Sequence, residues 1–163
     1  MLIVGFVILI FLARLLSPAD FGIIGMVVVF IAISQIFIDS GMTQALIREK
    51  NVTQEDYSTV FYYNLLIAII MYVLLFLTAN AISNYFREPI LIAIIRVIGL
   101  GMIISSLGLI QKTMLVRKID FKTQTKIEVT SSTASGIIAI IFAYIGFGVW
   151  SLVIRSLTQQ LIS

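Results

Sequence analysis

The chain has 163 residues, of which 60% are hydrophobic and only 12% are charged, with a formal net charge of +3. Its mean hydropathy is +1.12, whereas a soluble domain is about half apolar and about a quarter charged, so the composition favours an integral membrane protein. The sequence has no cysteine and no histidine, which excludes disulfides, thiolate or imidazole catalysis and the usual zinc ligands.

Six hydrophobic runs follow one another along the chain. About 20 apolar residues are needed to cross the hydrocarbon, so each run is a predicted membrane helix. The first run has no basic start and no cleavage site, and we interpret it as the end of a truncated helix rather than a signal peptide. The last run is cut off at Ser163. The predicted spans are residues 1–16, 21–46, 59–82, 90–111, 127–145 and 149–163. The expected fold is an all-α, polytopic membrane helical bundle in one transmembrane domain.

The connectors between these runs are of two kinds. Three are short and carry few charges, whereas the connectors around residues 48–58 and 111–126 are longer and more polar. The longer ones hold Arg48, Lys50, Lys112, Arg117, Lys118, Lys122 and Lys126. Basic loops stay in the cytoplasm, so the pattern predicts a cytoplasmic N-terminus. Since most of the positive charge clusters in these connectors between apolar runs, nucleic acid is not an expected partner.

Three lysines in the last of these connectors share one helical face. Lys118, Lys122 and Lys126 recur at every fourth residue. This spacing is typical of an amphipathic helix that lies on the inner leaflet and contacts anionic headgroups. An ordinary solvated basic loop explains the same residues, and the sequence leaves both interpretations open.

Two arginines lie inside the predicted spans. Arg96 is seven residues past Pro89, which places it about 10 Å into its span, and Arg155 is seven residues past Gly148. Ser151, Arg155 and Gln159 recur at every fourth residue and form one polar stripe. A charge at the bilayer centre costs about 3 kcal/mol, so such arginines usually face a bundle interior or a watery cavity.

We therefore hypothesise that Arg96 and Arg155, with Ser151 and Gln159, line a cavity that attracts a phosphate-bearing substrate, because a guanidinium can donate two hydrogen bonds to phosphate. Two alternatives stay open: Arg96 could reach the outer headgroups, and Arg155 could pair with Glu128.

Two acidic residues are candidates for coupling or gating. Asp39 lies near the inner end of the second span, where "DSG" also reads as a helix irregularity or cap, and Glu128 lies near the start of the fifth span. The sequence has no Walker-type glycine loop and no acidic cluster suited to a metal-dependent glycosyltransferase. We expect no catalytic residue, no metal site and no cofactor, and so not an enzyme.

Three motifs resemble a known family: "LARLLSPADFGIIGM" (12–26), "DSGMTQALIREK" (39–50) and "GFGVWSLV" (146–153). With the stretch 86–121, they are similar to polysaccharide flippases of the multidrug/oligosaccharidyl-lipid/polysaccharide exporter superfamily, in the lipopolysaccharide and colanic-acid branch. The resemblance covers nearly the whole chain.

The resemblance implies a transporter in the bacterial inner membrane that moves lipid-linked oligosaccharides of the undecaprenyl-pyrophosphate type by alternating access. Such proteins have two lobes around a cationic cavity, and this chain corresponds to one partial N-terminal lobe. A second lobe or a second copy is therefore an expected partner, besides membrane lipids. The alternatives are an exporter of small amphiphiles, which predicts a less cationic cavity, and a non-transporting scaffold or assembly subunit.

Overall fold

The computed structural model describes residues 2–39, 41–49, 52–117 and 121–162, and every regular element in these ranges is an α-helix. The helices are α1 (Leu2–Leu15), α2 (Pro18–Asp39), α3 (Met42–Arg48), α4 (Gln54–Phe86), α5 (Ile90–Arg117), α6 (Phe121–Ile145) and α7 (Val149–Ile162). Of these, α2, α4, α5 and α6 are long and apolar enough to cross a membrane, and α1 is a shorter apolar helix. The predicted all-α membrane bundle is thereby confirmed.

The region predicted as one span over 21–46 forms two helices. Pro18 occupies the first turn of α2, where a missing N–H costs nothing. Asp20 closes that turn, because its carboxylate accepts hydrogen bonds from the Ser17 N–H (3.0 Å) and the Ser17 hydroxyl (2.8 Å). Gly41 has a φ of 78°, in the left-handed region that glycine adopts readily, and this interrupts the helix between α2 and α3.

α4 and α5 also extend beyond the predicted apolar runs. Thr53 and Asp56 form a capping box at the start of α4, with the Thr53 N–H donating to the Asp56 carboxylate at 2.8 Å. The 33 residues of α4 span about 50 Å, more than the roughly 30 Å hydrocarbon thickness, so its ends reach past the apolar layer. α5 continues through Arg117, so that Lys112 lies on this helix and not in a loop.

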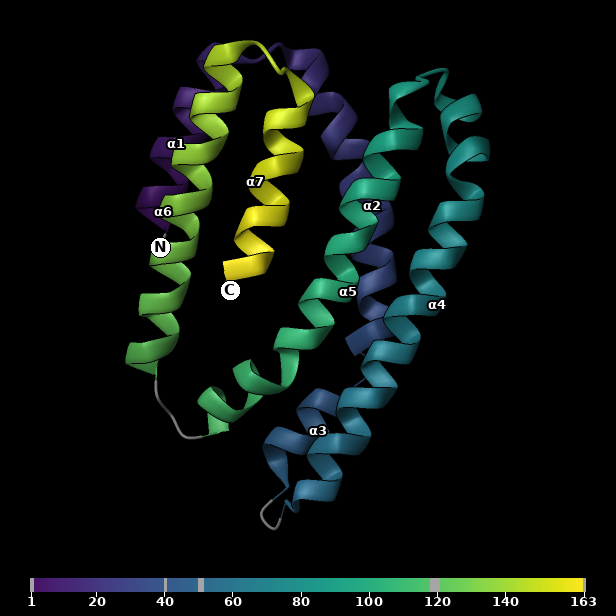
Figure 1. The fold of residues 1–163 in the computed structure, drawn as a ribbon, viewed down its shortest axis with the longest axis vertical. Coiled ribbons are helices and arrows are strands. Elements are labelled where there is room, and N and C mark those ends of the chain that lie inside the picture. Colours follow the sequence, from purple (N-terminus) through teal and green to yellow (C-terminus); the bar gives the residue numbers. More distant parts are fainter. Residues whose placement is uncertain (1, 40, 50–51, 118–120, 163) are drawn as a thin grey trace.

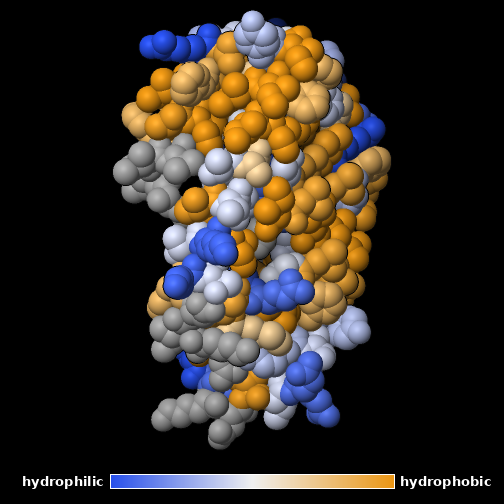
Figure 2. Space-filling view, turned by 60° about the vertical axis from the view of Figure 1, so that its left-hand side comes forward, coloured by the Kyte–Doolittle hydropathy of each residue, from blue (hydrophilic) through white to orange (hydrophobic). Residues whose placement is uncertain are grey.

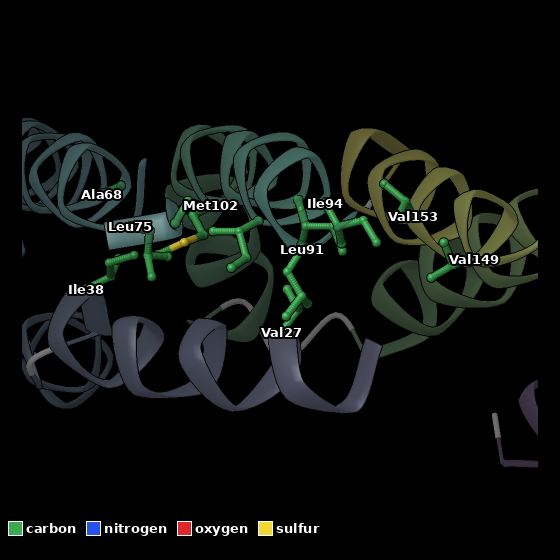
Figure 3. Close-up of a cluster of buried hydrophobic side chains, with 12 residues drawn as sticks. Val27, Ile38, Ala68, Leu75, Leu91, Ile94, Met102, Val149 and Val153 are labelled. Atoms are coloured by element: carbon green, nitrogen blue, oxygen red, sulfur yellow. The ribbon is translucent and has the colours of Figure 1, made fainter. Parts of the chain in front are cut away.

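The helices pack in two groups that meet at α7. One buried cluster joins α2, α4, α5 and α7, and a second joins α1, α6 and α7. Figure 3 shows Val149 and Val153 of α7 facing the side of the first cluster that includes Ile94 of α5. Leu152 of α7 belongs to the second cluster. The first turns of α7, and Ile24 of α2, which packs against both clusters, therefore hold the two groups together.

The two ends of the bundle differ in character (Figure 1). One end carries the short turns between α1 and α2, α4 and α5, and α6 and α7. The other carries α3, the end of α5 and the start of α6, and we call it the basic end because Arg48, Lys112, Lys122 and Lys126 lie near it. α5 runs beside α4 at the first end and approaches the start of α6 at the basic end.

Large apolar side chains cover much of the outer surface. Ile36 is 71% exposed, Leu77 69% and Phe6 63%. In Figure 2 apolar side chains cover the upper part of the visible face, and hydrophilic ones gather in its middle and lower parts. Exposed apolar surface on helices of this length is what a lipid environment requires.

The contact between α1 and α6 depends on a glycine. A Cβ added at Gly136 would overlap the side chain of Ile8, whereas one added at Gly25 of α2 would meet no atom within 4 Å. We expect Gly136→Leu to lower the free energy of unfolding by about 1–3 kcal/mol, because the side chain would force α1 and α6 apart. Gly25→Leu is the matched control, and thermal unfolding in detergent measures both. Equal stability of the two variants would contradict this packing.

Candidate functional site

Two adjoining cavities lie where α7 faces its neighbours, toward the basic end. The first, of about 370 Å³, is bounded by α2, α5 and α7. The second, of about 440 Å³, is bounded by α5, α6 and α7. Gly108, Lys112 and Gln160 line both. The polar residues around them are Gln35, Ser105, Ser106, Gln111, Lys112, Gln124, Glu128, Ser156, Gln159 and Gln160. The bundle thus has a polar interior beside its lipid-exposed surface.

Gln160 lies at the junction of the two cavities. The Ser105 hydroxyl donates to Gln160 Oε1 at 3.0 Å, and Gln160 Nε2 donates to Ser156 Oγ at 3.0 Å. Gly101 makes this approach possible, because a Cβ there would overlap the Gln160 carboxamide. The hydrogen bond between α5 and α7 therefore requires both the amide on α7 and a glycine one turn before Ser105.

An ion pair connects α5 with α6 in the second cavity. Lys112 Nζ lies 3.6 Å from Glu128 Oε1, and the two side chains are 45% and 26% exposed. At such exposure a pair contributes about 0.2–1 kcal/mol. The pair is weak enough to exchange for water or for a ligand.

Most other hydroxyls on these helices are satisfied within their own helix. On α6, the Ser131 hydroxyl donates to the Glu128 carbonyl at 3.1 Å, and the Ser135 hydroxyl to the Ser132 carbonyl at 3.2 Å. On α7, Ser151 is fully buried and donates to the Gly148 carbonyl at 2.7 Å. These serines allow close helix packing and offer no free donor to a ligand.

The predicted polar stripe of α7 therefore divides along the helix. Ser151 is buried near its start, Gln159 lines the first cavity, and Arg155 is half-buried between them, one turn before Gln159 on the same helical face. Neither Arg155 nor Arg96 lines either cavity. The shared substrate cavity of the two arginines stays a hypothesis.

Arg96 lies against α4. Its Cζ is 4.2 Å from the centroid of the Phe76 ring, and its Nε is buried without a hydrogen-bond partner. A cation–π contact contributes about 0.5–1 kcal/mol when exposed and about 2 when desolvated, less than the roughly 3 kcal/mol cost of a charge at the bilayer centre. The stacking explains the position of the side chain and leaves in-plane donors available.

The remaining predicted residues lie toward the basic end. Asp39 is the last residue of α2, and its side chain lies outside the described residues, as does all of Lys118. Lys122 and Lys126 are exposed in the first turns of α6. α5 reaches Arg117 and α6 begins at Phe121, so the described parts of 112–126 belong to these two long helices and not to a separate surface helix. Contact of the three lysines with a leaflet stays a prediction.

Sequence reasoning did not identify Lys112, Gln160 or Ser105 as site residues. Lys112 was assigned to a basic loop, because the apolar run ends before it while the helix continues. Ser156 and Gln160 recur at i and i+4, a helical spacing that could have marked a second polar row on α7. Nothing in the sequence pairs either of them with Ser105, 55 positions away from Gln160.

Comparison with known proteins gives a consistent match. A family model described as "Polysaccharide biosynthesis protein" matches residues 11–163. The succinoglycan biosynthesis transport protein ExoT of Rhizobium meliloti (strain 1021) is 28% identical over 93% of this chain and 31% of its own length. The teichuronic acid biosynthesis protein TuaB of Bacillus subtilis (strain 168) is 29% identical over 66% of this chain and 22% of its own length.

A further relative is the lipopolysaccharide biosynthesis protein WzxC of Escherichia coli (strain K12), 21% identical over 93% of this chain and 30% of its own length. The chain thus spans about a third or less of the length of these relatives. No solved structure matches it.

The two neighbouring glutamines of α7 allow a matched test of the Gln160 junction. We expect Gln160→Leu to lower the free energy of unfolding by about 1–3 kcal/mol, because the Ser105 hydroxyl loses its partner inside the bundle. Gln159→Leu, at a cavity-lining residue, should change it by less than about 0.5 kcal/mol. Thermal unfolding in detergent compares them, and a larger loss for Gln159→Leu would refute the assigned role of Gln160.

Proposed function

Because the chain belongs to the polysaccharide biosynthesis protein family, we propose that it is part of a transporter that moves lipid-linked polysaccharide precursors across the bacterial inner membrane. The observation that carries the proposal is the family match over residues 11–163. It is supported by a relative named as a transport protein and by helices that are long and apolar enough to span a membrane. The proposal assigns no catalytic step to this chain.

The arrangement of the helices suggests how such a transporter could work by alternating access. The two packing groups meet at the first turns of α7 and at Ile24 of α2, while α5 and α6 are joined at the basic end by the weak Lys112–Glu128 pair. Opening that pair would widen the cavities between the groups at little energetic cost. In this proposal Glu128 is a gating residue, and Asp39 stays a candidate for ion coupling.

We assign substrate contact to the polar face of α7. Arg155 and Gln159 share this face, and Gln159 lines the first cavity. A guanidinium one turn from a polar cavity can hold a phosphate bidentately and so attract the phosphate of a lipid-linked sugar of the undecaprenyl-pyrophosphate type. Arg96 lies against Phe76 of α4, and its share in a substrate cavity stays a prediction.

A complete transport path requires more protein than this chain. The chain corresponds in length to about a third or less of its relatives, and a cavity between two lobes cannot be formed by one. We propose that this bundle is one lobe and that a second lobe or a second copy completes the path.

Removal of the Arg155 charge tests the substrate contact. In the full-length protein we expect Arg155→Ala to reduce surface polysaccharide at least about tenfold, because the charge-assisted hydrogen bonds to phosphate are lost. Arg14→Ala, at an exposed arginine at the end of α1, should leave it unchanged. Immunoblots of membranes measure protein levels. Wild-type polysaccharide output from Arg155→Ala at wild-type protein level would refute the proposed contact.

The absence of cysteine allows a clean test of orientation. We propose that the basic end faces the cytoplasm, because lysine and arginine are retained there. In cells, a membrane-impermeant maleimide should label Ala19→Cys near the opposite end and should label Gln54→Cys at the basic end only after the membrane is permeabilised. Both positions are exposed. The reverse labelling pattern would place the N-terminus outside.

A further inference from the structure

Arg96 belongs to a small cluster on the face where α4 packs against α5. Its guanidinium lies over the ring of Phe76, and the ring of Tyr72, one turn earlier on α4, lies 6.0 Å from that of Phe76. Tyr72 also packs against Gly99 of α5, where an added Cβ would come within 3.0 Å of Tyr72 Cδ2. We call Tyr72, Phe76, Arg96 and Gly99 the α4–α5 cluster.

The charge of Arg96 is not balanced within the described part of the chain. Its Nε is buried and has no hydrogen-bond partner. The ion pair found among the described residues joins Lys112 and Glu128, 16 or more positions further along the chain and toward the basic end. A guanidinium carries five N–H donors in its plane, and the Phe76 ring, whose centroid lies 4.2 Å from Cζ, offers no oxygen or nitrogen acceptor to them. In-plane donors therefore remain for an acceptor from outside the chain.

The surroundings indicate where that acceptor comes from. Phe76 is 38% exposed, so the cluster opens to the outer surface, and the neighbouring exposed side chains Val73, Leu77 and Leu100 are apolar. Helical side chains lean toward the N-terminus of their helix, which carries the guanidinium toward the start of α5 at Ile90. A long side chain about 10 Å into a span can reach the level of the headgroup phosphates.

We propose that the α4–α5 cluster is a binding site for an anionic phospholipid of the surrounding leaflet. Arg96 donates to the phosphate through its planar fork, and the contact with the Phe76 ring holds the guanidinium in place. The acyl chains lie along the apolar surface formed by Val73, Leu77 and Leu100. This lipid is a resident of the bundle surface, and its binding does not depend on transport or on the identity of any transported sugar.

Lipid retention by the purified chain tests the proposal. The chain is exchanged into detergent with phosphatidylglycerol or with phosphatidylcholine of the same acyl chains, and bound lipid is measured by native mass spectrometry. We expect the wild-type chain to retain about fivefold more phosphatidylglycerol, as one cation near the headgroups allows. Arg96→Gln should reduce the preference, and Arg96→Lys should keep more of it than Arg96→Gln. Phe76→Leu should weaken it, because the guanidinium loses its support.

Arg14→Gln is the matched control, because Arg14 is an exposed arginine near the same end of the bundle and has no part in the cluster. It should leave the preference unchanged. Inorganic phosphate at constant ionic strength should not displace the lipid, which separates a lipid site from a free-anion site. Equal retention of both lipids by the wild type, an undiminished preference in Arg96→Gln, or displacement by inorganic phosphate would overturn the proposal.

Discussion

In a hydrocarbon environment, every backbone polar group must find a partner inside the protein, and this constraint shapes the whole bundle. The backbone meets it by forming helices, and most buried hydroxyls meet it by donating to a carbonyl of their own helix, as Ser34 does to Phe30 at 2.9 Å and Thr113 to Leu109 at 2.8 Å. The few polar side chains that form hydrogen bonds between helices therefore mark where the interior of the bundle is polar. Ser105 and Gln160 form such a bond, and it borders the two cavities.

α7 combines two roles along its 14 residues. Its first turns are apolar and buried, and through Val149, Leu152 and Val153 they join the two packing groups. Its later turns carry Ser156, Gln159 and Gln160 into the cavities. Because this helix is fixed between the two groups at one end and lines the cavities at the other, a change in how the groups pack can change the width of the cavities. This arrangement suits the proposed lobe of a transporter.

The cations of the chain are held in different ways. Lys112 pairs with a carboxylate across two helices, at a site that is open to solvent, and so it can change partner. Arg96 lies over an aromatic ring and has a buried Nε without a partner, and on this ground we propose that it binds an acceptor outside the chain. Arg155 is half-buried next to a polar cavity. The chemistry proposed for each follows from these surroundings and not from the charge alone.

The amino-acid sequence was sufficient to establish the class of the protein and the apolar part of its long helices, but not where those helices begin and end. Apolar runs that are long enough to cross a bilayer predict helices without a structure, because a chain segment in hydrocarbon must satisfy its own backbone hydrogen bonds. The motifs in residues 12–26, 39–50 and 146–153 also indicated the family. The break at Gly41 was partly visible, since "DSG" suggested an irregularity, but its left-handed backbone was not.

The tertiary structure alone decided which polar residues share a site. The sequence places Arg96 and Arg155 at similar depth in their predicted spans, but this depth does not fix the rotation of each helix about its axis. That rotation is set by packing contacts such as Gly99 against Tyr72 and Gly101 against Gln160. It turned Arg96 toward Phe76 and brought Lys112, Glu128 and Gln160 around the cavities. Residues far apart in the chain meet there because close helix packing, and not sequence spacing, determines their neighbours.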